Sequence, residues 1–334
     1  ATMPNAQGFD YYYGTPRFNG FTVYVKDTAM RSPILRNQEV VTKAVENWDN
    51  ITADYTKEAI GFIRRNRSKP FFLYLAHNMP HIPVGASEGF KGKSEYGPYG
   101  DTIEEIDWST GEILKTLKEL KLDESTLVVF TSDNGPWIET TRAMKPGAPF
   151  IPADHSGTAD PLRGYKMLTW EGGLRVPCVM RWPGRIPDGK VTDRLAATLD
   201  LLPTFAKLAG ADLPTERTID GVDISALWTD GTARARKEMR YYCFTHLQAI
   251  RNERWKLVLP RPAHPKWVGW SGRFVGNGVE KPELYDLKND LGEARDVAAA
   301  NPKVVAGLMK RVEHARRTAG DYNRIGEDAR FFDD

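Results

Sequence analysis

Cysteine is nearly absent from this chain, which holds only Cys178 and Cys243 in 334 residues. Two cysteines exclude a disulfide framework and a thiolate metal cluster. A single bridge between the two stays open from the sequence alone. The chain also contains no apolar run approaching the roughly 20 residues that a membrane-spanning helix needs.

An excess of charge of either sign is missing as well. The chain has 46 Lys and Arg against 44 Asp and Glu, a net charge of +2. Because the two signs are mixed along the chain and form no basic stripe, we expect no nucleic acid as a partner. The apolar content of 41% is that of an ordinary globular protein. The length predicts a large core with a second domain.

Several familiar catalytic motifs do not occur. There is no Gly-x-Ser-x-Gly nucleophile elbow, and the Gly-Lys-Ser triplet at 92–94 lacks the upstream glycine of a P-loop. His77 and His81 have the spacing of a zinc-binding helix, but Pro80 and Pro83 exclude a helix there. A loop after a strand is the better interpretation of these histidines.

The most informative stretch is residues 126–182. An apolar run at 127–130 predicts a buried strand, which ends in the turn Thr-Ser-Asp-Asn-Gly-Pro at 131–136. In an open parallel sheet, ligands bind just beyond the carboxyl ends of such strands. Asp133 and Asn134 offer a carboxylate and an amide oxygen side by side, as a hard cation prefers. An ordinary surface turn is the alternative, because Asn-Gly is also a strong turn signal.

A second block, Gly-Tyr-Lys-Met-Leu-Thr-Trp-Glu-Gly-Gly-Leu-Arg-Val-Pro, occupies 164–177. Together with the turn at 131–136, it resembles the formylglycine-dependent sulfatases of the alkaline phosphatase superfamily. The resemblance extends over nearly the whole chain, from Gln-Gly-Phe-Asp at 7–10 to the strings between 249 and 293. It implies that Asp133 and Asn134 are ligands of a divalent cation, usually Ca²⁺.

The resemblance also implies further site residues. Lys166 matches the lysine that grips a sulfate oxygen in these enzymes. His81, two residues before a proline, matches a histidine that hydrogen-bonds the sulfate. His155 and Arg163 lie in a loop that borders the substrate pocket in the family and are assigned to substrate binding. From the residue pattern alone, an ordinary surface loop is equally open for His81, His155 and Arg163.

Six other side chains receive different predictions. Glu171 and Arg175 are expected to form a buried structural pair. Phe18 stands where the family often has a serine, so no serine contact to the sulfate is expected there. The acidic residues Glu104, Glu105 and Asp107 are predicted to form a solvated helix face rather than a catalytic pair.

A loss of apolar content near 228–240 predicts a boundary between a first domain over 1–235, which by the resemblance is a sulfatase catalytic domain incomplete at its N-terminus, and a small α+β domain over 236–334. The resemblance implies that the first is an alkaline-phosphatase-like α/β domain, with a mostly parallel sheet flanked by helices. Helices are predicted at 53–66, 101–120 and 198–208, and strands at 70–76, 126–131 and 176–182. In the second domain we expect a hairpin from 247–251 and 255–259, a strand at 283–287, and a helix that begins at Pro302.

The family's nucleophile, a formylglycine made from Cys or Ser in a Cys/Ser-x-Pro-x-Arg motif, has no counterpart here. Neither Cys178 nor Cys243 lies in such a motif, and the family's upstream Asp-Asp metal ligands are also missing. We therefore expect the chain to match the C-terminal part of a sulfatase. Alone it should hydrolyse no sulfate ester and bind Ca²⁺ weakly. An N-terminal piece, upstream or on a complementary chain, would complete the site.

The function implied by the resemblance is hydrolysis of a sulfate ester on a sulfated carbohydrate. The expected partner is a sulfated small molecule or glycan, and the expected location is the periplasm or the cell exterior. Two alternatives stay open: a phosphodiesterase or phosphonate hydrolase of the same superfamily, and a non-catalytic sugar-binding remnant.

Overall fold

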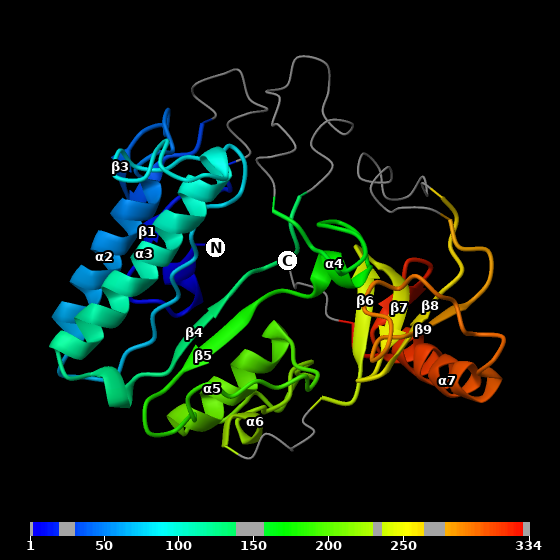
Figure 1. Cartoon of the computed structure of the whole chain (residues 1–334). Helices are drawn as coiled ribbons and strands as arrows, with labels where there is room; N and C mark the ends of the chain where they lie inside the picture. Colours follow the sequence, from blue (N-terminus) through cyan, green and yellow to red (C-terminus); the bar gives the residue numbers. More distant parts are fainter. Residues whose placement is uncertain (1–2, 20–30, 138–156, 230–235, 264–277, 330–334) are drawn as a thin grey trace. The chain divides into compact units, whose positions relative to one another are not determined.

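The computed structural model describes residues 3–19, 31–137, 157–229, 236–263 and 278–329 (Figure 1). The chain forms two compact units. The first unit comprises Ala1–Thr126 and Trp137–Gly157, and the second comprises Leu127–Pro136 and Thr158–Asp334. Among the described residues, no helix combines the length and the apolar character needed to cross a lipid bilayer.

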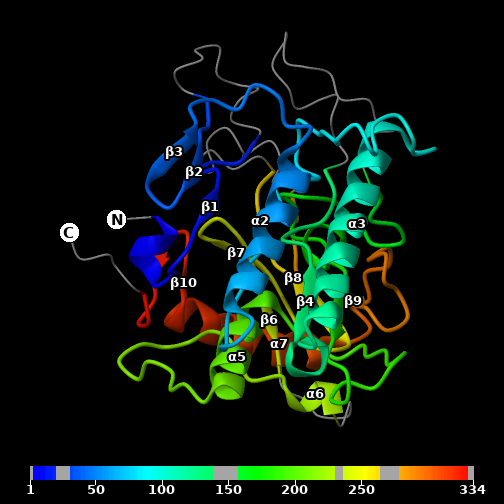
Figure 2. The same ribbon diagram turned by 90° about the vertical axis from the view of Figure 1, so that its left-hand side faces the viewer.

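Two long helices dominate the first unit, α2 (Ile51–Asn66) and α3 (Gly97–Glu119). They lie side by side in Figures 1 and 2 and confirm the helices predicted at 53–66 and 101–120. Tyr55, Ala59 and Ile63 of α2 are buried because they recur every four residues on one face. The other elements among the described residues of this unit are η1 (Pro4–Gln7), η3 (Asp123–Ser125) and an antiparallel sheet of β1 (Tyr13–Gly14), β2 (Ile34–Arg36) and β3 (Glu39–Thr42).

The buried strand predicted at 70–76 is not observed. The segment has no assigned strand structure and pairs with no other described strand. Its side chains alternate in exposure, so that Phe72 is 58% and Tyr74 72% exposed. A strand exists only through hydrogen bonds to a neighbouring strand. The apolar composition of this segment therefore could not by itself produce one.

One member of the predicted solvated helix face is buried instead. Glu104 and Asp107 of α3 are exposed, as predicted, but Glu105 is fully buried. Its Oε2 accepts a hydrogen bond of 3.0 Å from the Ser87 amide. The prediction for Glu105 was wrong because a loop from outside the helix packs on that face, and the carboxylate satisfies a backbone donor of that loop.

In the second unit, β4 (Val128–Thr131) and β5 (Cys178–Arg181) confirm the strands predicted at 126–131 and 176–182. They pair antiparallel, with Thr131 opposite Cys178. All strand pairings of the described residues are antiparallel, so the parallel pairing implied by the resemblance is not seen among them. The predicted helix at 198–208 corresponds to η5 (Thr198–Asp200) and α5 (Leu201–Ala209). Two short helices, α4 (Glu171–Leu174) and α6 (Ala226–Thr229), complete this part.

The C-terminal part is an antiparallel sheet followed by a helix, as predicted. The strand order is β6-β7-β8-β9, and β6 (Met239–Cys243) was not among the predicted strands. The helix α7 (Pro302–Thr318) covers one face of the sheet, where Leu308 and Val312 pack on its apolar side chains. The strands are β6 (Met239–Cys243), β7 (His246–Arg251), β8 (Trp255–Val258) and β9 (Glu283–Asp286), and a small ribbon of β10 (Gly320–Asp321) and β11 (Arg324–Ile325) follows α7.

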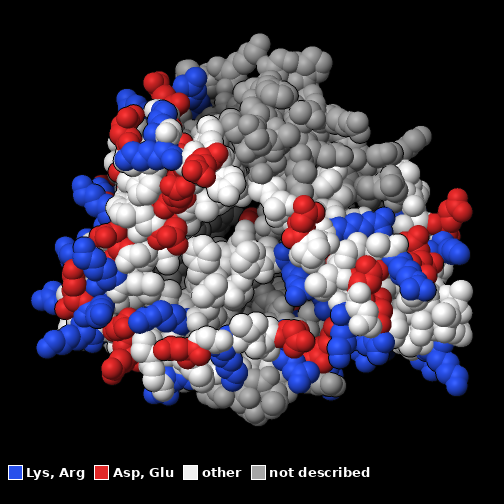
Figure 3. Space-filling model, in the orientation of Figure 1, with Lys and Arg blue, Asp and Glu red and all other residues white. Residues whose placement is uncertain are grey.

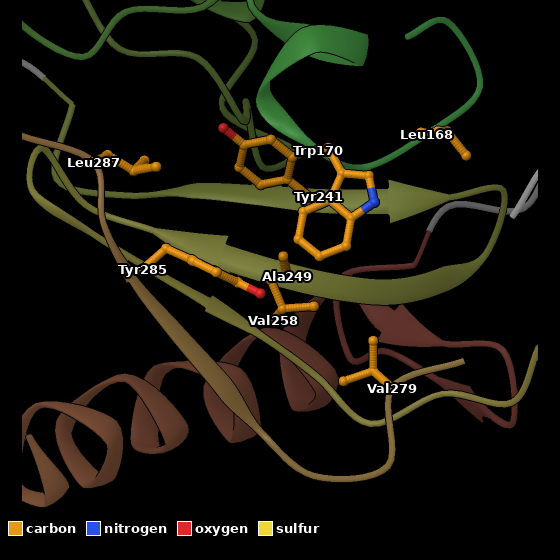
Figure 4. Packing of buried hydrophobic residues seen from close by; sticks show 8 residues of the cluster. All are labelled: Leu168, Trp170, Tyr241, Ala249, Val258, Val279, Tyr285 and Leu287. Atoms are coloured by element: carbon orange, nitrogen blue, oxygen red, sulfur yellow. The ribbon is translucent and has the colours of Figure 1, made fainter. Parts of the chain in front are cut away.

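The opposite face of this sheet is covered by the segment that precedes α4. Leu168 and Trp170 pack there against Tyr241, Val258 and Tyr285 (Figure 4). The predicted boundary at 235 therefore lies just before β6, but inside the second compact unit. Packing of residues far apart in the sequence holds the two sides of that boundary together.

The two cysteines do not form a disulfide, and the surface charge is mixed in sign. Cys178 is exposed on β5 and Cys243 is buried on β6, and both are free thiols. The bridge that the sequence left open is not formed. Positive and negative side chains are interspersed on the visible face of the molecule (Figure 3), in keeping with the balanced composition.

His77 makes the stability of the first unit depend on pH. Its ring stacks near Tyr55, and its Nε2 lies 3.3 Å from the Ser109 hydroxyl. Burial lowers the pKa of His77 to about 4, whereas an unfolded histidine titrates near 6.5. The contribution of the neutral His77 ring to the free energy of unfolding is therefore fully present above about pH 6.5. It is lost as the pH falls through about 4, which lowers the free energy of unfolding by up to about 3 kcal/mol.

We expect His77→Gln to remove this part of the acid sensitivity. Urea unfolding at about pH 7 and about pH 4 would give the difference in free energy of unfolding between the two conditions. That difference should shrink in the variant relative to the unsubstituted chain. An equal difference in both proteins would show that the imidazole does not titrate as its burial implies.

Candidate active site

The turn after β4 is held by its own hydrogen bonds. The Asn134 amide donates to Asp133 Oδ1 at 2.9 Å, and the Ser132 hydroxyl donates to the Asn134 carbonyl at 3.2 Å. The Asn134 side-chain nitrogen donates to the Gly135 carbonyl at 3.0 Å. Because that nitrogen serves the turn, the Asn134 side-chain oxygen is the atom suited to a cation, beside the exposed carboxylate of Asp133.

Gly135 brings this turn against α4. Its amide donates to the Gly173 carbonyl at 3.0 Å. A Cβ at Gly135 would overlap the carbonyl oxygen of Gly172, so no larger residue fits this approach of two backbones. The turn signal in the sequence therefore marks a close backbone contact and not a hairpin.

Lys166 lies next to the same turn. Its amide donates to the Pro136 carbonyl at 2.9 Å. Burial lowers the pKa of the Lys166 ammonium, while the nearby charge of Asp133 opposes that shift. The second unit thus brings Asp133, Asn134 and Lys166 to one place, although their catalytic and metal-binding roles stay predictions.

His81 belongs to the first unit. Its Nδ1 lies 2.7 Å from the Ile82 carbonyl oxygen, which can only accept, so Nδ1 carries the proton of this hydrogen bond. The rings of His81 and Phe18 meet edge to face at a centroid distance of 5.2 Å. Asn19 donates to the His81 carbonyl at 2.5 Å and fixes the loop. The convergence of His81 with Lys166 stays a prediction.

His155 and Arg163 are the two residues assigned to substrate binding. His155 lies outside the described residues. Arg163 stacks on Trp170, with its Cζ 3.6 Å from the ring centroid, and it donates to the Tyr285 hydroxyl at 3.3 Å and the Glu293 carbonyl at 3.0 Å. These contacts join its loop to the C-terminal sheet, and a role of Arg163 toward substrate stays a prediction.

The predicted pair of Glu171 and Arg175 is wrong. Arg175 is exposed, whereas Glu171 is fully buried and lies 2.5 Å from Arg251 and 3.2 Å from Lys256. Its other partner is the Tyr241 hydroxyl at 2.8 Å. The prediction failed because the counter-charges come from strands at least 80 residues further along the chain.

Sequence reasoning missed Arg251, Lys256 and Glu293 altogether. One available signal was Lys256 itself, which stands in the otherwise apolar string Trp-Lys-Leu-Val of β8. A lysine in a strand that is buried on both faces requires a buried anion. That argument would have indicated the need for a partner but not its identity.

A metal could be held only in part by the described residues. Among them, no three His, Cys, Asp or Glu side chains come together as a metal-binding group. Asp133 and Asn134 supply two adjacent oxygen donors of the hard type that Ca²⁺ takes, out of the six or more that it requires. These two oxygen donors fit one part of a calcium site, and other ligands would have to complete it.

Comparison with known proteins identifies the family. The family model described as Sulfatase matches residues 1–211, and the model for the C-terminal part of N-sulphoglucosamine sulphohydrolase matches 165–318. Human steryl-sulfatase is 35% identical over 315 residues, which cover 89% of this chain and 52% of that protein. The N-acetylgalactosamine-6-sulfatase of Canis lupus familiaris is 39% identical over 232 residues, covering 66% and 42%.

The fold agrees with these matches. The solved structure of the sulfatase PsFucS1 from Pseudoalteromonas sp. superposes with a TM-score of 0.78 at 26% identity and covers 94% of this chain and 67% of its own. This likeness confirms the expected alkaline-phosphatase-like α/β fold with a C-terminal antiparallel sheet and helix. The chain spans about half the length of the curated relatives that it matches. It belongs to the sulfatase family.

Proposed function

We propose that the complete enzyme hydrolyses sulfate esters, with a sulfated carbohydrate as substrate. The observation that carries this proposal is the meeting of Asp133, Asn134 and Lys166 around one turn in a chain of the sulfatase family. Support for a sugar substrate comes from relatives whose names specify N-acetylgalactosamine and N-sulphoglucosamine.

In this proposal each residue has a physical task. Asp133 and Asn134 would hold a calcium ion, which would supply polarisation of the sulfate and stabilisation of an oxygen nucleophile. Lys166 donates hydrogen bonds to a sulfate oxygen, where negative charge must be stabilised in the transition state. Asp133 assists by favouring the charged form of that ammonium. His81 uses its second ring nitrogen toward the sulfate.

We also propose that the nucleophile is a formylglycine supplied from outside these 334 residues, upstream or on a complementary chain. The sequence has no Cys/Ser-x-Pro-x-Arg motif. Burial raises the pKa of the Cys243 thiol, which makes this thiol a poor nucleophile. By the same family likeness, the proposed location is the periplasm or the cell exterior.

The 334-residue chain alone is therefore expected to release no product from a chromogenic aryl sulfate. Its calcium affinity, measured by calorimetry, should be weak, with a Kd on the order of 10⁻⁴ M or higher, because two ligands are a small part of a full site. Asp133→Ala should abolish the residual heat of calcium binding. Turnover by the isolated chain would refute the proposed origin of the nucleophile.

A complementation experiment decides between hydrolysis and mere sugar binding. A formylglycine-bearing N-terminal piece from a homologous sulfatase is added, and release of sulfate from a sulfated oligosaccharide is measured. We expect turnover that depends on both pieces. Binding of the oligosaccharide without turnover by the joined pieces would instead favour a non-catalytic sugar-binding protein, and cleavage of a phosphonate ester in preference to the sulfate would favour a phosphonate hydrolase.

A further inference from the structure

A buried ionic cluster joins α4 to the C-terminal sheet. Lys256 of β8 lies 3.2 Å from Glu171 Oε1 and 2.7 Å from Glu293 Oε1. Arg251 of β7 lies 2.5 Å from Glu171 Oε2, and the Tyr241 hydroxyl of β6 donates to Glu171 Oε1 at 2.8 Å. These five residues, called the Glu171 cluster below, hold two cations against two carboxylates in the interior of the second unit.

The electrostatics of the cluster keep Glu171 ionised. Burial by itself would raise the pKa of Glu171, but the charges of Lys256 and Arg251 outweigh it and leave that pKa below its usual value. Burial and the charge of Glu171 raise the pKa of Tyr241 well above its ordinary range, so its hydroxyl stays a donor. All four charged side chains are buried.

Such a cluster is poorly explained by stability alone. Well-packed apolar side chains of the same volume are often as stabilising as a buried ion pair, because they need no desolvation of charge. What charged groups add is direction, since each hydrogen bond fixes the orientation of its partner. Glu171 is held from three strands of the sheet at once, and this fixes the first residue of α4.

The position of α4 determines the position of the turn that carries the proposed metal ligands, because their backbones are in contact. The Glu171 amide donates to Glu293 Oε2 at 2.7 Å, which ties the backbone of α4 as well as its side chain. Two residues later, the Gly173 carbonyl accepts the Gly135 amide at 3.0 Å. Because the backbones of Gly135 and Gly172 are in contact, a shift of α4 must move the turn.

The loop that carries Lys166 is packed against the same short helix. The Gly172 amide donates to the Arg163 carbonyl at 2.7 Å. A Cβ at Gly173 would overlap the carbonyl oxygens of Tyr165 and Leu168, so the backbone on both sides of Lys166 touches α4. Trp170 fills the space between this loop and the sheet, as Figure 4 shows.

We propose that Glu171, Lys256 and Glu293 are positioning residues, through which the C-terminal sheet holds the Asp133–Asn134 turn and Lys166 in their mutual arrangement. The sheet is then a part of the site's scaffold and not an appendage. The importance of this arrangement for catalysis rests on the proposed function. The positioning itself is measurable without turnover.

The test is amide hydrogen exchange in the 334-residue chain, followed residue by residue by NMR. Tyr241→Phe removes one hydrogen bond to Glu171 without adding volume. Tyr242→Phe is the matched control, because its hydroxyl donates to the Gly320 carbonyl at 3.0 Å and does not touch the cluster. We expect the Gly135 and Lys166 amides to exchange about tenfold faster in Tyr241→Phe, the scale of one lost bond to a charged group.

In Tyr242→Phe these two amides should keep the exchange rates of the unsubstituted chain. Equal rates in all three proteins, or equal acceleration in both variants, would overturn the proposal and leave the cluster with a general structural role. Should Tyr241→Phe fail to fold, Glu293→Gln gives the same test, since it removes a charge from Lys256 but keeps an acceptor for the Glu171 amide.

Calcium titration of the same proteins separates this inference from the proposed function. If the unsubstituted chain binds calcium, Tyr241→Phe should weaken binding and Tyr242→Phe should not. If no protein binds calcium while the exchange rates change as expected, the metal site of the proposed function fails and the positioning stands. If Tyr241→Phe binds calcium normally and its amide exchange rates are unchanged, the proposed positioning role is refuted and the proposed metal site is retained.

Discussion

Replacing Lys256 by methionine is expected to lower the free energy of unfolding of the second unit by about 3–5 kcal/mol. Methionine keeps most of the volume of the side chain but removes the cation between Glu171 and Glu293. Two carboxylates then remain buried close together, and burial already raises the pKa of Glu293. Urea unfolding monitored by circular dichroism at neutral pH would measure the loss.

An exposed lysine of the same unit provides the control for this substitution. Lys207 pairs with Asp223 at the surface, and its side chain is 64% exposed. Lys207→Met should change stability by no more than about 0.5 kcal/mol. The double variant Lys256→Met, Glu171→Gln should be less unstable than the two single effects added together, because it removes charge of both signs. A loss below about 1 kcal/mol for Lys256→Met would show that the cluster is not the buried, coupled group that the distances indicate.

Replacing Lys166 by methionine, in an enzyme completed with the formylglycine segment, is expected to lower kcat by about 10²- to 10³-fold. The proposed reason is loss of a donor to the sulfate oxygens, where charge must be stabilised most strongly in the transition state. Steady-state kinetics with a chromogenic aryl sulfate would give kcat and KM separately. Lys207→Met again serves as the control, with unchanged kinetics.

The division of the effect between kcat and KM is as informative as its size. A fall in kcat shows that the ammonium acts in the transition state, while a rise in KM alone would show that it only helps to bind the sulfate. If kcat and KM both changed by less than about threefold, Lys166 would have no role in binding or turning over the sulfate. The hydrogen bond of its amide to Pro136 would then be its main structural contribution.

Most of the local structure was predictable from the sequence. The helices α2 and α3 follow from apolar residues at a spacing of three to four, and α7 begins at Pro302 directly after Asn301, as predicted. The adjacent oxygen donors at 133 and 134 were evident from the turn that follows β4. All of these features depend on residues within a few positions of one another, so a short stretch of sequence is enough to predict them.

The predictions that failed concern features that depend on residues far apart in the sequence. The segment at 70–76 has the apolar composition of a buried strand, yet strand structure depends on a partner that local composition does not specify. Glu105 lies on a helix between exposed acidic neighbours, and only a loop from elsewhere made it a buried acceptor. Arg175, four positions from Glu171, was the nearest cation in sequence but not in space.

The sequence by itself determined the helices α2, α3, α5 and α7, the strands β4, β5 and β7 to β9, and the chemistry of the turn at 133–134, because each arises from side chains within a few positions. Only the tertiary structure decided that Glu171 finds its counter-charges on β7 and β8, and that Gly135 lies against Gly172. These contacts join segments tens of residues apart. Which of them form depends on how whole elements pack and exclude water, and no short stretch of the chain carries that information.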